Sequence, residues 1–382
     1  MRILILGAGL MAQGAAFDYL RSPALSSLVV ADVSKQALAA FRKRFPDPRL
    51  RVAEADARDT NKVAALMSDA DAVFCAVHYG FNLEFTKAAI ATKTHMVDLG
   101  GNNDVVAAQR KLSDSAEKAG VSIIPDCGLA PGMASVLVAW GLKRFDWADT
   151  AKIRVGGLPQ QPKEPFQYER LFSVEGLINE YVEPPVLLRD GEIIMGEPLG
   201  DLEVLEFDLP VGTLEAFNTS GGVSTLPESF RTRVKNLDYK TLRYPGHVAA
   251  MRWLMHLGLF DSSPVTVDGT EIVPRRLTAN RILAHVPLGS RDRTVVRIEF
   301  SGPDRGRRRR HRLEIIDDAD SANNLSSMMR TTAFPAAIIS QMQCDGRITL
   351  LGVRPQELAV DPDSFVTELI RRGIRIKGIE DA

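Results

Sequence analysis

Cysteine and long apolar runs are both scarce in this sequence. The three cysteines, Cys75, Cys127 and Cys344, are too few and too scattered for a disulfide framework, which fits a reducing compartment such as the cytoplasm. No apolar run approaches the roughly 20 residues of a membrane span, and the short run that ends at Gly7 is typical of a strand rather than of a signal peptide. We therefore expect a cytoplasmic protein with no membrane partner.

Neither sign of charge is in excess. Lysine and arginine number 47 against 48 aspartate and glutamate residues, a formal net charge of −1, so no long-range field favours nucleic acid as a partner. Six arginines between Arg305 and Arg312 form either a solvated hairpin tip or a basic patch, and the balanced charge favours the tip. The six histidines are scattered, without an HExxH or paired-cysteine motif, so we expect no metal site.

The first third of the chain alternates short apolar runs with helix-like stretches. We predict strands at Arg2–Leu6, Leu28–Ala31, Leu50–Ala55, Ala72–Val77, His95–Leu99 and Val121–Pro125. We predict helices at Leu10–Arg21, Lys35–Phe45, Asn61–Met67, Asn82–Thr92 and Val105–Ala119. Strands joined by helical crossovers are typical of an α/β fold with a doubly wound parallel sheet of the Rossmann type.

The pattern changes after a turn rich in glycine and proline at residues 126–132. Beyond it, apolar and polar residues alternate in several stretches, which favours a second, α+β domain with an antiparallel sheet. One strand pair is expected at Val295–Phe300 and Leu313–Ile316, around a turn at residues 302–304. Helical character returns at residues 322–342.

A glycine-rich loop follows the first predicted strand. It reads Gly7-Ala8-Gly9-Leu10-Met11-Ala12, a G-x-G-x-x-A pattern. Gly7 allows the tight turn, Gly9 lets the backbone approach a pyrophosphate, and Ala12 is small where helix and strand pack closely. The helix that starts at Leu10 offers N–H groups and a partial positive charge to the phosphates. The loop therefore predicts a dinucleotide site.

An acid at the end of the second strand indicates which dinucleotide binds. Asp32 lies 25 residues after Gly7, where a carboxylate accepts hydrogen bonds from a ribose 2′-hydroxyl and repels a 2′-phosphate. No arginine follows immediately, although Lys35 is close, so NAD is favoured over NADP. Asp56, after the third strand, either meets the adenine or is an exposed turn acid. Because ligands bind beyond strands 1 and 4 of such a sheet, the segment Ala76-Val77-His78 is expected on the nicotinamide side.

Six longer motifs resemble the saccharopine dehydrogenase superfamily, and most closely its lysine 6-dehydrogenase branch. They are IPDCGLAPG at 124–132, VGGLP at 155–159, FSVEGL at 172–177, LEAFNTSGGVSTL at 214–226, YKTLRYPGH at 239–247 and RTTAFP at 330–335. The resemblance is dense from residue 1 to about residue 250. The chain departs from the family pattern at Cys127, at residues 78–80 and in its arginine-rich turn.

The resemblance implies a domain organisation. Members of the superfamily place a substrate domain of mixed sheet and helix after a Rossmann domain, and their last helices return to the dinucleotide domain. Applied here, this implies a dinucleotide domain at 1–130, a substrate and dimerisation domain at 131–320, and returning helices at 321–382. It also implies a homodimer formed through the second domain.

The resemblance also implies a reaction. The lysine 6-dehydrogenase branch oxidises the ε-amine carbon of L-lysine with NAD, and the imine hydrolyses to a semialdehyde with release of ammonia. Two alternatives stay open: an enzyme for a secondary amine, either saccharopine or a carboxyalkyl polyamine, and an NAD-binding sensor without turnover. An ammonium group with a pKa of about 10.4 must lose a proton before hydride can leave, so the reaction needs a base or a desolvated site.

Five residues are candidates for this chemistry near the nicotinamide and the substrate's carboxylate. Asp126, after the sixth strand, is the first candidate for the base, unless it only caps the following helix. His78 and Tyr79 are alternatives, as a base or as walls over the ring, unless they only pack their loop. Arg243 offers a guanidinium that pairs bidentately with a carboxylate, with a structural ion pair as the alternative. His247 beside it is either a donor or a structural histidine.

The family motifs supply further candidates for substrate binding. Tyr168 and Glu175 match motif positions, and Glu175 either holds an ammonium group or is a surface acid. The loop at residues 220–225 either lines a pocket, with its backbone N–H groups and the hydroxyls of Ser224 and Thr225, or is a plain turn.

Overall fold

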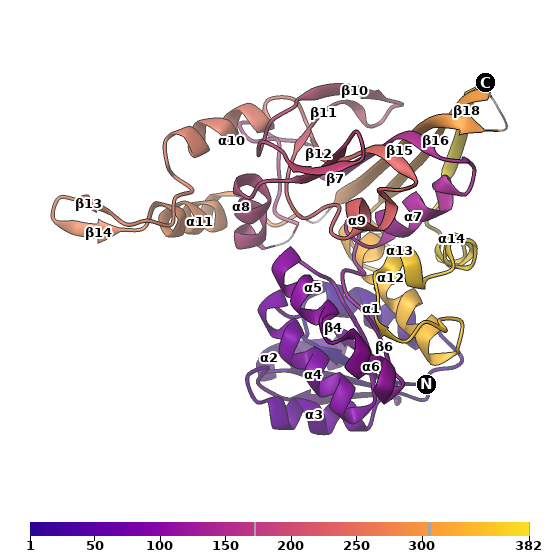
Figure 1. Ribbon diagram of the computed structural model, residues 1–382. Helices are drawn as coiled ribbons and strands as arrows, with labels where there is room; N and C mark the ends of the chain where they lie inside the picture. Colours follow the sequence, from indigo (N-terminus) through magenta and orange to yellow (C-terminus); the bar gives the residue numbers. More distant parts are fainter. Residues whose placement is uncertain (172, 290, 305–306, 382) are drawn as a thin grey trace. The chain divides into compact units, whose positions relative to one another are not determined.

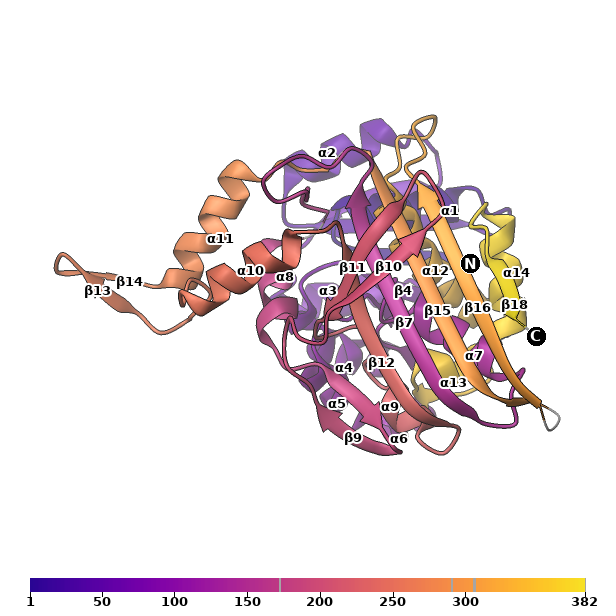
Figure 2. The same ribbon diagram turned by 90° about the horizontal axis from the view of Figure 1, so that it is seen from above.

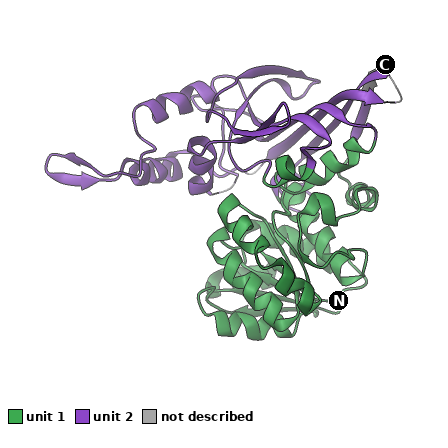
Figure 3. Cartoon of the chain, viewed as in Figure 1, with its two compact units in different colours: residues 1–143, 224–229, 329–375 green, residues 144–223, 230–328, 376–382 purple. Residues whose placement is uncertain are grey.

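The computed structural model describes residues 1–171, 173–289, 291–304 and 307–381, which form two compact units (Figure 3). Unit 1 comprises Met1–Lys143, Ser224–Ser229 and Met329–Arg375, and unit 2 comprises Arg144–Val223, Phe230–Met328 and the residues from Ile376 onward. Phe172 of the third motif and Arg305 of the arginine-rich turn lie outside the described residues. None of the described helices is both long and apolar enough to span a membrane.

Unit 1 is built on a seven-stranded parallel sheet, ordered β17-β6-β5-β4-β1-β2-β3. Strands β4 and β6 of this sheet are labelled in Figure 1, together with helices α1 to α6. The strands of the sheet are β1 (Arg2–Leu6), β2 (Ser27–Asp32), β3 (Leu50–Glu54), β4 (Ala72–Cys75), β5 (His95–Asp98), β6 (Ser122–Ile124) and β17 (Gly352–Val353). The intervening helices are α1 (Leu10–Leu20), α2 (Lys35–Arg44), α3 (Thr60–Ser68), the 3-10 turn η1 (Tyr79–Phe81), α4 (Asn82–Thr92), α5 (Asn103–Arg110) and α6 (Ser113–Ala119). This strand order confirms the predicted Rossmann-type sheet.

Two details of this sheet differ from the prediction. The predicted helix Val105–Ala119 is two helices, because Asn102 caps α5 and the chain turns through Lys111 before α6 begins. The seventh strand, β17, has no counterpart in the prediction, because two residues are too short to show an apolar pattern.

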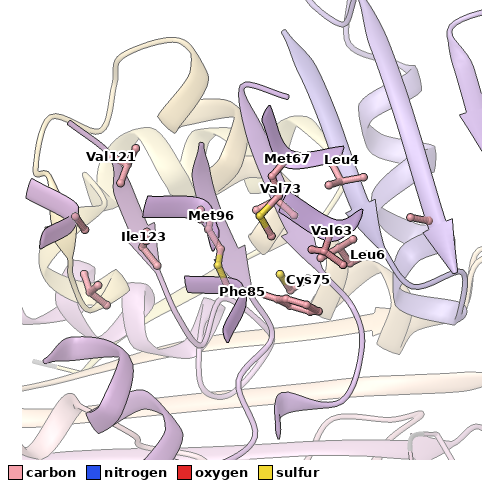
Figure 4. Close-up of a cluster of buried hydrophobic side chains, with 14 of the residues drawn as sticks. Leu4, Leu6, Val63, Met67, Val73, Cys75, Phe85, Met96, Val121 and Ile123 are labelled. Carbon is pink, nitrogen blue, oxygen red and sulfur yellow. The ribbon is translucent and has the colours of Figure 1, made fainter. Parts of the chain in front are cut away.

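The core of unit 1 lies between the sheet and helices α3, α4 and α6 (Figure 4). Its labelled side chains, each at most 3% exposed, are Leu4, Leu6, Val63, Met67, Val73, Cys75, Phe85, Met96, Val121 and Ile123. Full burial of one such side chain contributes about 1.5–3 kcal/mol to folding. The cluster therefore holds β1, β4, β5 and β6 in fixed positions, and the loops of the candidate site leave from these strands.

The remaining helices of unit 1 come largely from the C-terminal part of the chain. They are α7 (Met133–Leu142), α9 (Leu226–Phe230), α12 (Ser327–Cys344), α13 (Gln356–Ala359) and α14 (Pro362–Arg371). Helix α12 packs on α1, where a Cβ at Gly14 would lie 2.9 Å from that of Ala333. The rings of Phe17 and Phe334 stack beside this contact at 6.3 Å. The first segment of unit 1 runs from Met1 to Lys143.

Unit 2 is built on a nine-stranded mixed sheet (Figure 2). Its main order is β10-β11-β12-β7-β15-β16-β18, with β8 beside β12 and β9 beside β8. The strands are β7 (Ala148–Pro159), β8 (Val186–Arg189), β9 (Glu192–Met195), β10 (Glu203–Phe207), β11 (Gly212–Asn218), β12 (Val234–Arg243), β15 (Asp292–Asp304), β16 (Arg307–Asp318) and β18 (Lys377–Asp381). The helices α8 (Val174–Val182), α10 (His247–His256) and α11 (Pro274–His285) and the hairpin β13 (Val265–Val267) and β14 (Thr270–Ile272) complete it. The α+β character predicted for the second domain is confirmed.

Strands β15 and β16 pair further than the sequence predicts. Gly302, Pro303 and Asp304 are opposite Arg309, Arg308 and Arg307 in the antiparallel ladder, so the predicted turn at residues 302–304 is wrong. Ion pairs support the longer register, since Arg309 lies 3.3 Å from Asp304 and Arg312 lies 2.8 Å from Glu299. Residues 307–310 therefore lie along an exposed strand rather than at a hairpin tip.

Candidate active site

The loop after β1 fits the backbone of a dinucleotide. Gly7 has φ +102°, and a Cβ there would lie 2.7 Å from the carbonyl oxygen of Ala76, so only glycine allows this approach. Gly9 precedes α1 without a side-chain cap, and a Cβ at this position would meet no atom within 4 Å. The first turn of α1 is therefore open to a pyrophosphate. Of the remaining predicted loop residues, Leu10 is exposed, Met11 is half-buried and Ala12 is buried.

Asp32 closes β2 and holds this loop from one side. Its Oδ2 accepts a hydrogen bond from the N–H of Ala8 at 2.8 Å, and its Oδ1 accepts from the N–H of Ser34 at 2.7 Å. Each oxygen keeps a lone pair that suits a ribose hydroxyl. Lys35 is the cation nearest to Asp32 in sequence. Its Nζ lies 3.3 Å from a carboxylate oxygen of Glu54 and is thus already paired with an acid.

Asp56 is held at the surface by a neighbouring arginine. Both of its carboxylate oxygens accept from the guanidinium of Arg58, at 2.6–3.1 Å. These hydrogen bonds lower the pKa of Asp56 to about 2. Asp56 is half-buried in its turn and is paired with Arg58.

Asp126 lies directly after β6 in a strained, buried position. It has φ +60° and is only 2% exposed. Burial raises its pKa to about 7, and the neighbouring charge of Asp98 adds to the shift. The hydroxyl of Ser224 donates to Oδ2, which favours the ionised form. Helix α7 begins after Gly132, so Asp126 does not cap it.

The loop after β5 shapes the position of this carboxylate. A Cβ at Gly100 would lie 1.8 Å from Oδ1 of Asp126, so the carboxylate fits only against glycine. Asp98, fully buried at the end of β5, accepts from the N–H groups of Asp126 at 3.0 Å and Gly100 at 2.8 Å, and from Nε2 of Gln109 at 2.8 Å. Sequence reasoning missed Asp98, although an acid followed by Gly100-Gly101 at a strand end was a usable signal.

His78 and Tyr79 occupy the loop after β4. The two rings lie 4.2 Å apart, and Nδ1 of His78 accepts from the N–H of Gly80 at 3.1 Å. The ring of Tyr79 lies 2.9 Å from the Cβ position of Gly101, whose backbone also bonds to Asp126. The loops after β4, β5 and β6 therefore meet at one edge of the sheet, as the predicted site requires. Val77 is half-buried beside Gly7.

A short segment inserted from between β11 and β12 completes this edge. Besides Ser224, it contributes Thr225 and Ser229, whose hydroxyls donate to Oε1 of Glu357 at 2.8 Å and 2.6 Å. Glu357 lies on α13, and its burial raises its pKa. Thr225 therefore holds the segment in place, and Ser224 alone of the two predicted hydroxyls bonds to Asp126.

Cys127, next to Asp126, is a packing residue. It is fully buried, its thiol donates to the carbonyl of Ile124 at 3.2 Å, and burial raises its pKa well above the usual value. A thiolate nucleophile does not form under these conditions. Across the described stretches, no group of three or more His, Cys, Asp or Glu side chains could hold a metal ion.

Arg243 ends β12 in the interior of unit 2. It is 3% exposed, and its guanidinium lies 5.1 Å from the centre of the Tyr168 ring. Its Nη1 donates to the carbonyl of Leu242 at 2.9 Å, while its Nε has no hydrogen-bond partner among the described residues. It also forms no ion pair with any described carboxylate, in contrast to the structural-ion-pair alternative. A buried guanidinium in this state suits an anionic ligand.

A hydrogen-bond network fixes the residues around Arg243. Nδ1 of His247 donates to the carbonyl of Phe166 at 2.9 Å, so Nε2 accepts from the hydroxyl of Tyr181 at 2.9 Å. Tyr181 in turn accepts from Arg243. Burial and the charge of Arg243 lower the pKa of His247 to about 3, so the imidazole is neutral. Both ring nitrogens of His247 are engaged, and this histidine positions Tyr181.

Three acids on or beside α8 differ in their surroundings. Glu175 is exposed and forms an ion pair with Arg275 at 2.9 Å, as expected of a surface acid. Glu183 accepts from the hydroxyl of Ser220 at 3.3 Å. Glu180 is half-buried beside Tyr181, and burial raises its pKa to about 7. Sequence reasoning missed Glu180; its place at the border of the helix's apolar positions was the available signal.

Two family profiles match the chain. The saccharopine dehydrogenase NADP binding domain matches residues 3–124, and the saccharopine dehydrogenase C-terminal domain matches residues 128–374. The bovine mitochondrial alpha-aminoadipic semialdehyde synthase is 23% identical over 278 residues, which cover 68% of this chain and 28% of that protein. The saccharopine dehydrogenase (NADP+, L-glutamate-forming) of Saccharomyces cerevisiae is 24% identical over 306 residues, 74% of this chain and 62% of that protein. The chain thus spans less than two thirds of these relatives.

Two solved structures share the fold. Apo saccharopine dehydrogenase (L-Glu forming) from Saccharomyces cerevisiae has a TM-score of 0.82 at 20% identity, covering all of both chains. The homospermidine synthase of Legionella pneumophila, solved with NAD, has a TM-score of 0.68 at 10% identity and covers all of this chain and 91% of that one. At these identities the likeness concerns the fold alone.

Proposed function

The chain belongs to the saccharopine dehydrogenase family, and from this premise we propose that it oxidises the ε-amine carbon of L-lysine with NAD. Unit 1 is an NAD(P)-binding domain of this family of oxidoreductases. The observation that carries the proposal is Arg243, the one buried cation of the described part of unit 2 that forms no ion pair. Because an unpaired buried charge is costly, its expected partner is the carboxylate of a ligand.

Asp126 is the proposed base. Its pKa of about 7 lies near neutral pH, where a general base combines a sufficient ionised fraction with a useful affinity for protons. It takes a proton from the ε-ammonium, directly or through a water, which frees the nitrogen lone pair. The iminium cation then forms when the C–H bond breaks. When bound, the nicotinamide accepts the hydride.

The rest of the chemistry follows from the substrate. The lone pair of nitrogen forms the C=N bond as hydride leaves the ε carbon. Water then adds to this carbon, and ammonia leaves to give a semialdehyde. Arg243 holds the α-carboxylate through charge-assisted hydrogen bonds from its planar guanidinium.

Two observations support NAD over NADP. The carboxylate of Asp32 disfavours a 2′-phosphate, and the neighbouring cation Lys35 already faces Glu54 at 3.3 Å. The Legionella structure that shares the fold was solved with NAD, whereas the yeast relative is named for NADP. Kinetics with both cofactors test this choice: we expect a kcat/KM at least tenfold higher with NAD.

A second candidate substrate is saccharopine, because the yeast relative is named for it. Saccharopine carries a secondary amine and additional carboxylates, which would require further cationic partners. Within the described residues of unit 2, the other buried cations are each bonded to acids of the chain. This favours a substrate with one carboxylate near Arg243.

A substrate panel tests the proposal. The purified protein is incubated with NAD and L-lysine, saccharopine or L-norleucine, which lacks the ε-amine, and reduced cofactor is followed by its absorbance. We expect reduction with L-lysine and none with L-norleucine. Reduction with saccharopine alone would replace the proposal by the secondary-amine reaction. Cofactor binding without reduction on any amine would indicate a sensor.

A further inference from the structure

Two charged groups of unit 2, Arg243 and Glu180, form no ion pair with a described residue. Arg243 forms no ion pair, and its Nε has no hydrogen-bond partner. The carboxylate of Glu180 has neither a hydrogen bond nor an ion pair with any described residue, although the charges of the two groups interact. The other charged groups around them, Glu175 and Glu183, are bonded to Arg275 and Ser220.

The surroundings of this pair are rigid and largely aromatic. Tyr181 accepts from Arg243 and donates to His247, while the ring of Tyr168 lies against the guanidinium. Tyr239, on the same face of β12, is buried against Gly222, where a Cβ would lie 2.3 Å from the ring. These contacts hold the guanidinium of Arg243 in place.

We propose that Glu180 and Arg243 together bind the zwitterionic head of an α-amino acid, with Glu180 on the α-ammonium and Arg243 on the α-carboxylate. A carboxylate and a guanidinium that do not pair with each other are complementary to a ligand that carries an ammonium group and a carboxylate on the same carbon. Glu180 is then a specificity-determining residue that distinguishes α-amino acids from simple carboxylates. The inference rests on the proposed function only for the identity of the side chain beyond the head.

Burial and desolvation strengthen the expected selectivity. Hydrogen bonds to charged groups are stronger than hydrogen bonds between neutral groups. A ligand that lacks the matching group leaves the polar group of the site unpaired, and the site therefore binds it more weakly. Burial raises the pKa of Glu180 to about 7, Arg243 opposes this shift and Glu183 adds to it. A bound ammonium group stabilises the ionised carboxylate and offsets the cost of burying it.

The first experiment measures head-group binding without turnover. Calorimetry compares L-norleucine with hexanoate, which lacks the α-amine, on the protein saturated with reduced cofactor. We expect hexanoate to bind about 10–100-fold more weakly than L-norleucine, as for the loss of a charge-assisted hydrogen bond. In Glu180→Gln this difference should vanish, because L-norleucine weakens while hexanoate does not change. Glu175→Gln, an exposed acid on the same helix, is the matched control and should keep the difference.

The second experiment uses turnover. L-lysine is compared with 6-aminohexanoate, which keeps the carboxylate and the reacting amine but lacks the α-amine. In Glu180→Gln we expect KM for L-lysine to rise about 10–100-fold with little change in kcat, and KM for 6-aminohexanoate to stay constant.

The outcomes separate this inference from the proposed function. Equal weakening of both head groups, or no change in either, in a Glu180→Gln protein that still binds cofactor would overturn the role of Glu180. Failure of L-lysine oxidation in the wild type, with the norleucine preference intact, would overturn the proposed function and leave the head-group site standing.

Discussion

The two faces of β12 carry buried charges in opposite situations. On one face, Nζ of Lys240 lies 2.7 Å from Glu203, and Asp238 accepts from Arg154 at 2.5 Å. On the other face, Arg243 forms no ion pair with the described residues. Side chains alternate between the faces of a strand, so a few consecutive residues contain both situations.

The presence or absence of an ion pair indicates which buried charges stabilise the fold and which are available to bind a ligand. Removing a charge from water costs several kcal/mol, and on the first face acids of the chain offset this cost. On the second face nothing in the described chain does so. Unit 1 shows the same contrast between two carboxylates. Asp98 accepts from three donors, whereas Asp126 has fewer partners. Burial raises the pKa of both carboxyls, and that of Asp126 reaches about 7.

Asp126→Asn tests the contrast in unit 1 and has the largest expected effect. An asparagine keeps the shape but cannot accept the proton, so kcat should fall on the order of 10³-fold while the Kd for NAD is unchanged. Asp98→Asn is the control, and we expect it to lower the melting temperature as well as activity, because Asp98 organises two loops. Near-normal turnover in Asp126→Asn would remove this residue from its proposed role.

Arg154→Met tests the paired face of β12. The substitution leaves the buried Asp238 and the half-buried Glu203 without one of their cations and should lower the free energy of unfolding by about 3 kcal/mol. Urea denaturation measures this loss. KM for the substrate should not change in the fraction that stays folded, and a selective rise in KM would contradict the division between the two faces.

Arg243→Met tests the unpaired face. Losing the guanidinium should raise KM for the substrate about 100-fold, as for removal of one partner of a buried charge pair. The free energy of unfolding should stay constant or increase, because the variant no longer buries an unpaired charge. A loss of stability as large as that of Arg154→Met would show that Arg243 serves the fold.

Ser224→Ala gives the smallest predicted effect. Asp126 must be ionised to act as a base, so kcat/KM of the wild type should rise with pH through about 7. The Ser224 hydroxyl stabilises the ionised form of Asp126, so its removal should raise the pKa of Asp126. The rise of kcat/KM with pH should then shift to higher pH by up to about one unit. An unchanged limb in a pH–rate profile would mean that another group titrates.

Local patterns made the first sheet and part of the site predictable. Strand and helix alternate with short loops up to β6, and the positions of Gly7, Asp32 and Asp126 follow from where those strands end. Arg243 was identifiable from its motif. By contrast, β17 has two residues, and the β15–β16 register depends on cross-strand ion pairs that no turn signal shows.

The residues that sequence reasoning missed share a physical cause. Glu180 and Glu357 are ordinary helical acids in sequence. Glu357 is distinctive because it is buried with one carboxylate oxygen unbonded, and Glu180 because it is half-buried without a bonded partner among the described residues. Whether an acid has a partner depends on residues far away in the chain. For the same reason, the arginine partners of Glu175 and Asp56 could not be read from the sequence.

The pairing of β17 with β6 has a consequence for how the chain is made. Gly352 pairs with Ser122, so a ribosome that adds 5–20 residues per second completes this edge of the sheet about 10–45 s after it has made β6. During that interval the edge of β6 and the face of α1 that receives α12 are open to other chains. A gene fragment ending at Lys143 would keep them open permanently, and we expect it to aggregate even though it encodes the whole glycine loop.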